Sequence, residues 1–282
     1  MCDIRKNAEA FGVHPASGGR LDSNPASVLG TNNVSPLTMA TAFAGIANGG
    51  KVCTAIAIDR IVDATGNDHA APASACTQAV SPQVAAAMAY ALKGVTTHGT
   101  AAGMNKTGKD MLAKTGTTDG NEQLWLVAAT TKVAGAYWVG NIDGHADMRK
   151  IYPSHGTTPA TARTAVMRTM MDAAVTKYGG DGFPAPTATL LRGTPITIPD
   201  LTGKTTANAQ ETLRGLGLNY RDGGIQPGDE PAGRVHASSP AAGGSAYNGD
   251  TITVYSSAGP KPSPTSGPTP PPTGPAMPPP GR

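Results

Sequence analysis

Apolar residues recur at helical spacing in three parts of the chain. Residues 36–47 and 82–94 each begin at the proline of a Ser-Pro pair. The serine hydroxyl can then cap a helix whose first position is the proline. Residues 159–178 show the same period. These patterns predict three amphipathic helices, the second stopped by Gly94, and a shorter helix over 3–11 before a loop over 13–34. The faces expected to pack on a sheet are Leu37, Ala40, Phe43, Ala44 and Ala47; Val84, Met88, Ala91 and Leu92; and Ala162, Ala165, Val166, Thr169, Met170 and Ala173.

Short apolar runs between these helices indicate strands. Residues 111–115, 123–130 and 132–140 are separated by polar turns, a pattern that predicts an antiparallel meander. Residues 52–62, followed by a turn near Gly66, indicate a β-hairpin between the first two long helices. Helices on an antiparallel sheet give an α+β fold class for residues 1–185.

A second, smaller unit follows a boundary rich in glycine and proline at 179–195. Its pattern predicts one helix with Ala209, Leu213 and Leu216 facing a sheet. The expected elements are a strand at 196–199, the helix at 205–216, and strands at 218–221, 234–238 and 251–256. Residues 259–282 are mostly Pro, Gly, Ser and Thr, a composition that predicts a disordered tail.

Charge and hydropathy restrict the possible partners and location. The formal net charge is +3 and both signs are scattered, which argues against a nucleic-acid partner. No segment has the roughly 20 apolar residues of a transmembrane helix, and Met1 is not followed by a signal peptide. The chain is therefore expected to be either cytosolic or a fragment whose membrane anchor lies upstream.

The three cysteines predict no metal site, because they form no C-x-x-C pair and have no histidine at ligand spacing. We expect neither a metal nor a cofactor. Cys53 and Cys76 flank the hairpin segment. Two interpretations stay open: a disulfide, if the protein is extracytoplasmic, or two unpaired small apolar side chains.

The sequence Lys-Thr-Gly occurs twice, and only the second copy lies on an expected strand. In the stretch Lys114, Thr115, Gly116, Thr117, an ammonium and two hydroxyls are expected to face a substrate carboxylate. Gly116 would allow the substrate backbone close, and the Thr117 N–H could act as an oxyanion donor. The first copy, Lys106–Gly108, resembles a P-loop but has Asp110 where Ser or Thr is needed, so we expect an exposed loop.

These motifs resemble a known family. The stretch 113–141, together with "SPLTMATAFAGIANGG" at 35–50 and "GVTTHGT" at 94–100, resembles the end of the transpeptidase domain of class A penicillin-binding proteins. The resemblance covers about residues 1–185. It implies a D,D-transpeptidase that cross-links peptidoglycan outside the cytoplasmic membrane, with peptidoglycan stem peptides and β-lactams as partners.

The chain departs from the family pattern in one respect. No serine is followed three residues later by lysine or two residues later by asparagine, so the S-x-x-K and S-x-N motifs are absent. The family's nucleophilic serine is therefore expected in a missing N-terminal portion of the same protein, and this chain alone is expected to be inactive. His98 lies beside the 94–100 segment and receives no role.

Residues 196–258 resemble a PASTA domain. The resemblance rests on "IPDLTG" at 198–203, Gly217-Leu218, Ser239-Pro240 and the final "NGDTITVYSSAG". PASTA domains are proposed to recognise peptidoglycan fragments or β-lactams. An alternative to the enzyme-fragment hypothesis is therefore a non-catalytic peptidoglycan-binding protein that acts through this domain, although a spacer role fits the domain equally well.

Overall fold

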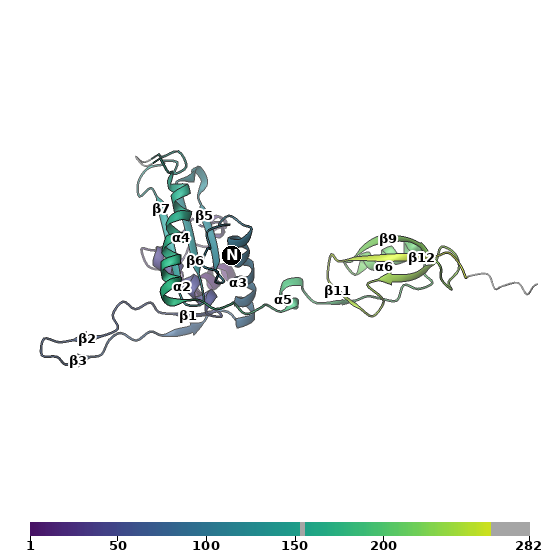
Figure 1. Cartoon of the computed structure of the whole chain (residues 1–282), viewed down its shortest axis with the longest axis horizontal. Helices are drawn as coiled ribbons and strands as arrows, with labels where there is room; N and C mark the ends of the chain where they lie inside the picture. Colours follow the sequence, from purple (N-terminus) through teal and green to yellow (C-terminus); the bar gives the residue numbers. More distant parts are fainter. Residues whose placement is uncertain (153–155, 261–282) are drawn as a thin grey trace, which may run out of the picture. The chain divides into compact units, whose positions relative to one another are not determined.

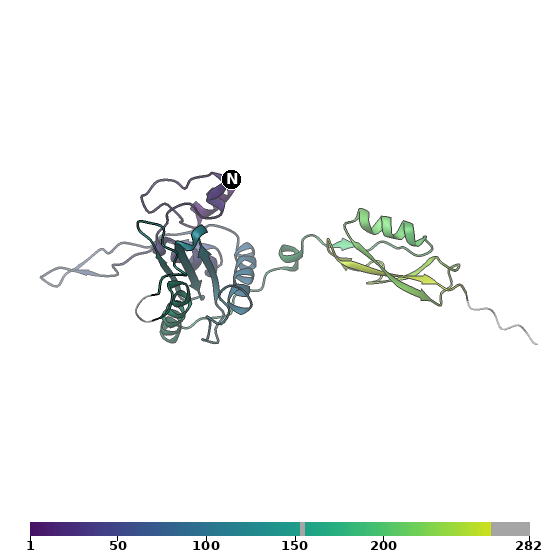
Figure 2. The ribbon, with the colours of Figure 1, turned by 90° about the horizontal axis from the view of Figure 1, so that it is seen from above.

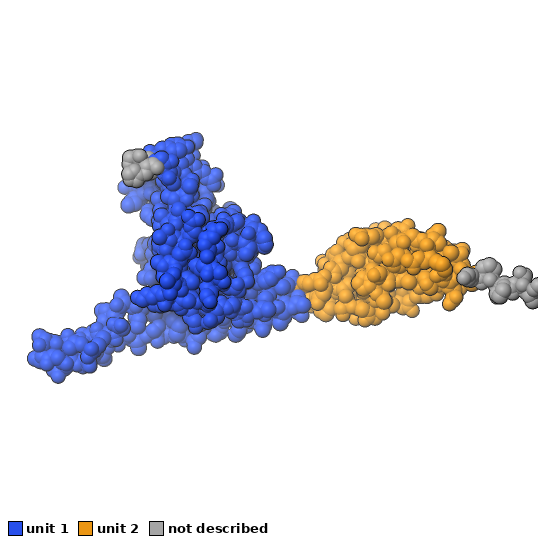
Figure 3. All heavy atoms as spheres, viewed as in Figure 1, with its two compact units in different colours: residues 1–191 blue, residues 192–282 orange. Residues whose placement is uncertain are grey.

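The computed structural model describes residues 1–152 and 156–260. The chain divides into two compact units, Met1–Leu191 and Arg192–Arg282 (Figure 3). The predicted tail at 259–282 lies almost entirely outside the described residues. Among the described residues, no helix combines the length and the apolar character needed to span a bilayer.

The first unit is built on an antiparallel sheet of three strands, in the order β5–β6–β7 (Figure 1). The strands are β5 (Leu112–Thr117), β6 (Gln123–Ala129) and β7 (Ala134–Gly140). Gly116 lies opposite Trp125, and Trp125 lies opposite Trp138. The predicted meander is therefore confirmed.

Three long helices begin at a capped proline, and the cap was predicted from the sequence for the first two. They are α2 (Pro36–Ala47), α3 (Pro82–Thr97) and α4 (Pro159–Tyr178). The hydroxyls of Ser35, Ser81 and Thr158 each accept a hydrogen bond from the backbone N–H three residues later. In each case proline occupies the first helical position, where its missing N–H costs nothing.

Helices cover both faces of the sheet (Figures 1 and 2). Leu112 and Val127 point to the face that packs on Phe43 and Ile46 of α2. Their strand neighbours point the other way and pack on α4: these are Met111, Ala113, Leu126 and Ala128. The sheet is thus the middle layer of three.

Helix α3 does not end at Gly94, as the sequence predicted, but continues to Thr97. The buried Thr96 hydroxyl donates a hydrogen bond of 3.0 Å to the Met111 carbonyl, just before β5. An interior glycine costs a helix about 1 kcal/mol relative to alanine. This tertiary contact offsets that cost, so the final turn forms.

The predicted face is wrong for α4 and only partly right for α3, where Met88 and Leu92 pack against the core as expected. In α4 the buried side chains are Met167, Met171 and Val175, whereas Val166 and Met170 are exposed.

In α3 the sheet contacts small residues, so the expected Val84 is exposed while three alanines are buried: Ala85, Ala86 and Ala89. In α2 the prediction holds for Phe43 and Ala47 but not for Leu37. Small side chains let α3 approach the sheet closely, whereas in α4 the helical period was correct but the buried stripe lies on a different face from the predicted one.

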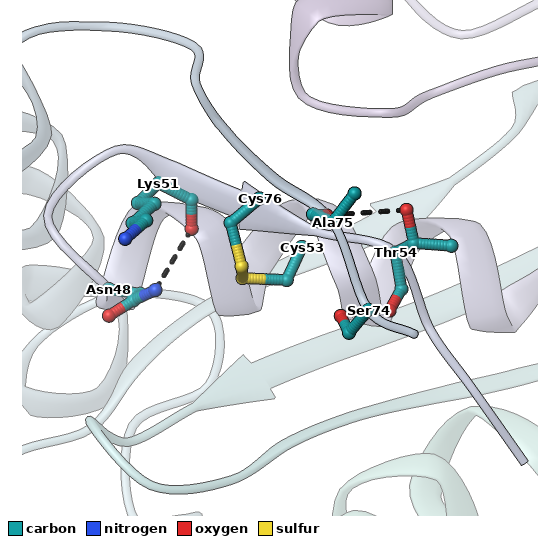
Figure 4. The surroundings of a disulfide bond; sticks show 7 residues. All are labelled: Asn48, Lys51, Cys53, Thr54, Ser74, Ala75 and Cys76. Atoms are coloured by element: carbon teal, nitrogen blue, oxygen red, sulfur yellow. Dashed lines mark hydrogen bonds between the residues drawn. A yellow bond between two sulfur atoms is a disulfide. The ribbon is translucent and has the colours of Figure 1, made fainter. Parts of the chain in front are cut away.

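An extended arm leaves the first unit between α2 and α3 (Figure 1). Strands β1 (Lys51–Cys53) and β4 (Cys76–Gln78) pair at its base, and β2 (Ile61–Val62) and β3 (Asp68–His69) form the expected hairpin around Gly66. Cys53 lies directly opposite Cys76, and the two form a disulfide (Figure 4). The structure thus decides between the two interpretations of these cysteines. Cys2 is a free, exposed thiol.

The remaining elements of the first unit are α1 (Cys2–Ala10) and two short 3₁₀ helices, η1 (Pro25–Val28) and η2 (Asp119–Asn121). Helix α1 agrees with the expected helix over 3–11. Otherwise residues 13–34 form the predicted loop. Helix α5 (Ala188–Arg192) lies at the division between the units.

The second unit has its own core. A mixed sheet runs β10–β12–β9, with β12 antiparallel to β10 and parallel to β9, while β8 pairs with β11. The elements are β8 (Ile196–Thr197), α6 (Thr206–Gly215), β9 (Asn219–Gln226), β10 (Val235–Ser239), β11 (Ser245–Ala246) and β12 (Thr251–Ser257). Ala209 and Leu213 are buried as predicted, but Leu216, just after the helix, is exposed. Strand β11 was not predicted.

Candidate active-site strand

The second Lys-Thr-Gly copy lies on β5, which is an edge strand because it pairs only with β6 among the described strands. The Thr118 N–H donates to the Gln123 carbonyl at 3.1 Å. In an antiparallel pair, successive residues direct their backbone groups alternately toward the partner strand and away from it. Gly116 therefore bonds to β6, whereas the N–H and C=O groups of Thr115 and Thr117 point to the open edge.

Lys114 reaches the same open edge. Its side chain is exposed, and Nζ donates a hydrogen bond of 2.9 Å to the Thr115 carbonyl. That carbonyl is one of the groups directed away from β6. The ammonium of Lys114 and the N–H of Thr117 consequently lie along one edge, where an extended molecule with a negative charge could bind both.

Thr115 is joined to the segment that follows α3. The Thr100 and Thr115 hydroxyl oxygens lie 2.6 Å apart, and either can be the donor. The Thr96 bond to the Met111 carbonyl fixes the same segment to the start of β5. The structure therefore brings "GVTTHGT" beside the second Lys-Thr-Gly copy. His98 is exposed, and its Nδ1 lies 3.0 Å from the Thr97 hydroxyl oxygen.

Gly116 makes room for a neighbouring strand residue. A Cβ at this position would lie 3.1 Å from the Trp125 Cβ, which is closer than ordinary van der Waals contact. The tight contact with Trp125 gives this glycine a packing reason that is separate from the predicted approach of a substrate backbone.

Arg163 of α4 approaches β5 from the face opposite α2 and α3. Its Nη1 lies 3.1 Å from the Gly116 carbonyl oxygen and 3.4 Å from the Thr117 hydroxyl and the Trp125 carbonyl. Burial, and then the nearby Arg149, lower the pKa of the Arg163 guanidinium. The sequence analysis missed this residue. Its signal was the four-residue spacing with Met167 and Met171, which places a charge on the buried stripe of α4.

The first Lys-Thr-Gly copy is a loop between α3 and β5, as expected. Lys106 is exposed, and Asn105 organises the turn by accepting from the Thr107 N–H and donating to the Lys109 carbonyl. A helix precedes this loop and a strand follows it, which is the reverse of a P-loop.

The comparisons with known proteins match the site to a family. A family model described as the penicillin-binding protein transpeptidase domain matches residues 3–172. The chain belongs to this family. Its second unit matches the PASTA domain over residues 196–258.

Curated relatives of this penicillin-binding protein chain are much longer than it is. Penicillin-binding protein 1A of Neisseria lactamica is 32% identical over 136 residues, which are 46% of this chain and 17% of the relative. Penicillin-binding protein 1B of Vibrio cholerae is 28% identical over 121 residues, covering 42% and 16%. The matched segments thus span about a sixth of these relatives.

Solved structures show the same fold. PonA1 of Mycobacterium tuberculosis in complex with penicillin V has a TM-score of 0.55 at 24% identity, covering 65% of this chain and 52% of that one. A second structure of PonA1 gives 0.56 at 23% identity, with the same coverage. These values support the α+β arrangement of a transpeptidase domain.

Residues 1–152 and 156–260 contain no group of three or more His, Cys, Asp or Glu side chains placed to hold a metal ion. The groups present along the edge of β5 are an ammonium, hydroxyls and backbone N–H groups. These groups bind anions and stabilise oxyanions, but they include no activated nucleophile.

Proposed function

We propose that this chain forms the Lys-Thr-Gly side of the active site in a D,D-transpeptidase that cross-links peptidoglycan. The observation that carries the proposal is the open edge of β5, where the Lys114 ammonium and the Thr117 N–H lie together. Membership in the penicillin-binding protein transpeptidase family supports the same assignment.

Three residues of β5 have roles in the proposed reaction: Lys114, Thr115 and Thr117. A serine attacks the carbonyl of the penultimate D-alanine, the terminal D-alanine leaves, and an amine of a neighbouring stem peptide resolves the acyl-enzyme. Lys114 binds the terminal carboxylate together with the hydroxyls of Thr115 and Thr117. The Thr117 N–H stabilises the oxyanion that forms on the attacked carbonyl.

The hydroxyl pair of Thr100 and Thr115 suits this carboxylate role. One hydroxyl proton bridges the two oxygens over 2.6 Å. The other proton remains available, because each threonine carries one donor and two acceptor lone pairs. A substrate carboxylate can accept it without breaking the bond between the two threonines.

The nucleophile is absent from the 282 residues, which contain no S-x-x-K motif. We propose that an N-terminal portion of the same protein supplies it, and that this chain alone is inactive. β-Lactams would acylate the same serine, as the penicillin V complex of PonA1 suggests. The Cys53–Cys76 disulfide favours an extracytoplasmic location, where thiols become oxidised.

Fluorescent penicillin tests the proposal directly. A form of the protein extended upstream to include S-x-x-K should become covalently labelled, and residues 1–282 alone should not. Pretreatment with unlabelled penicillin should block the labelling. If the extended form stays unlabelled while it is folded, the proposed activity is wrong.

The alternative is a non-catalytic protein that binds peptidoglycan through its PASTA domain. The missing nucleophile favours it, as does a cavity of about 240 Å³ in that domain, lined in part by Asp200, Leu201 and Ser238. Titration of the chain with a soluble muropeptide, followed by amide NMR, should then shift resonances around this cavity. Unchanged spectra at millimolar ligand would remove the alternative.

A further inference from the structure

Hydrogen bonds of Arg163 Nη1 reach the active-site strand β5 and its neighbour β6. The shortest, at 3.1 Å, joins Arg163 Nη1 to the Gly116 carbonyl oxygen. The Gly116 carbonyl and the Thr117 N–H belong to the same planar peptide unit. The guanidinium therefore holds the carbonyl end of the group whose N–H end points to the open edge of β5.

We propose that Arg163 is a positioning residue for transpeptidation, which orients and polarises the 116–117 peptide so that the Thr117 N–H becomes a strong oxyanion donor. The inference rests on the proposed function, because it assumes that an oxyanion forms at this edge. It adds a residue that lies outside the Lys-Thr-Gly motif and 47 positions from Gly116.

Two physical effects support this role. A charge-assisted donor on a carbonyl polarises the whole amide, so its N–H donates more strongly through cooperative hydrogen bonding. The rigid guanidinium plane also restrains the peptide orientation, since Nη1 lies within 3.4 Å of the Thr117 hydroxyl and the Trp125 carbonyl as well. The pairing of Gly116 with Trp125 of β6 holds this peptide from the same carbonyl side, so Arg163 adds charge to a peptide that the sheet already orients.

The surroundings of Arg163 strengthen both effects. The side chain is partly buried on the α4 face of the sheet, and its Nε is buried without a hydrogen-bond partner among the described residues. Screening by water is weaker in such a place than at the surface, so the charge acts on its neighbours at a lower effective dielectric constant. A guanidinium kept there at a desolvation cost is consistent with an electrostatic role.

Acylation kinetics give the first test, in the longer form that carries the nucleophile. Arg163→Gln removes the charge, Arg163→Lys keeps it, and Arg168→Met alters an exposed arginine of the same helix. At saturating β-lactam, the glutamine variant should acylate about tenfold more slowly and the lysine variant within about threefold of wild type, because the loss falls on the transition state. The control should match wild type. If both Arg163 variants acylate at the wild-type rate while Lys114→Ala is slow, the inference is wrong.

Infrared spectroscopy of the acyl-enzyme separates positioning from structural support. A weaker oxyanion donor should move the ester carbonyl stretch to higher wavenumber in Arg163→Gln, less so in Arg163→Lys, and not at all in Arg168→Met. A slower rate with an unshifted stretch would assign Arg163 to folding alone and overturn the inference. If the glutamine variant does not fold, the lysine variant decides: a small upward shift supports the inference and no shift defeats it.

Amide NMR of this chain alone makes the inference independent of the proposed function. In Arg163→Gln, and to a smaller extent in Arg163→Lys, the Thr117 amide proton should move upfield. The Thr115 amide, whose preceding carbonyl does not contact Arg163, should stay in place. An unmoved Thr117 resonance would overturn the inference. Normal acylation of Lys114→Ala would instead count against the proposed function only.

Discussion

The hydroxyls of Thr100 and Thr115 lie 2.6 Å apart and join the segment after α3 to the active-site strand. We expect Thr100→Val to destabilise the protein by about 1 kcal/mol, the usual contribution of one hydrogen bond. Urea unfolding of Thr100→Val, Thr115→Val and the double variant measures the coupling between them. Because a coupled pair loses one shared bond, the double variant should cost less than the two single changes together. Strict additivity would show that the pair contributes nothing.

The two Lys-Thr-Gly copies should respond differently to mutation. In the longer protein that carries the nucleophile, Lys114→Ala should slow β-lactam acylation at least about tenfold, which corresponds to about 1.4 kcal/mol of transition-state stabilisation. Lys106→Ala is the matched control, because Lys106 is exposed on the loop between α3 and β5 and is not part of that strand. Stopped-flow acylation of both variants makes the comparison. Equal slowing would mean that the wrong copy was chosen.

Replacing two glycines of the first unit by alanine should change the stability of the protein in opposite directions. Gly94 lies within α3 with no atom within 4 Å of an added Cβ, so Gly94→Ala should stabilise the protein by about 0.5–1 kcal/mol through helix propensity. Gly116→Ala should destabilise it, because the new Cβ would lie 3.1 Å from the Trp125 Cβ. Denaturant midpoints of the two variants against wild type check both signs. A stabilising Gly116→Ala would mean that Trp125 moves aside without cost.

The disulfide at the base of the arm should be detectable by thiol counting. Without reductant, alkylation should modify only Cys2, and after reduction all three cysteines. Replacing Cys53 and Cys76 by alanine opens a loop with a sequence separation of 23, so the free energy of unfolding should fall by about 3 kcal/mol. Mass spectrometry and urea unfolding measure the two effects, with Cys2→Ala as the control. Three reactive thiols in oxidised protein would contradict the structure.

Acid should weaken the contact at the start of β5. Lys93 Nζ lies 2.6 Å from an Asp110 carboxylate oxygen, and this hydrogen bond, helped by the Phe183 N–H and opposed by burial, lowers the Asp110 pKa. A carboxyl with a lowered folded pKa stabilises the protein above its unfolded pKa of about 3.9. That contribution is lost as the pH falls through the lower folded value. The free energy of unfolding should therefore drop below about pH 4 more steeply in wild type than in Asp110→Asn. Parallel pH profiles would refute the assignment.

The sequence by itself determined most of the helices and strands and their order, although it missed the short strand β11. Helix starts follow from Ser35-Pro36 and Ser81-Pro82 because a capping hydroxyl and a proline act within three residues of each other. The meander and the placement of Lys114 and Thr115 on its first strand follow from short apolar runs between polar turns, although the strand continues to Thr117. The order of elements in the PASTA domain follows from similar local signals.

Only the tertiary structure decided which groups meet. Arg163 reaches Gly116 across 47 positions, and Thr100 reaches Thr115 across 15. Neither contact changes a local pattern, so no short-range rule can find it. The buried faces of α3 and α4 were likewise set by packing on the sheet, which buries alanines of α3 and the Met167, Met171 and Val175 stripe of α4. Packing between distant segments, and not the spacing within them, built the site.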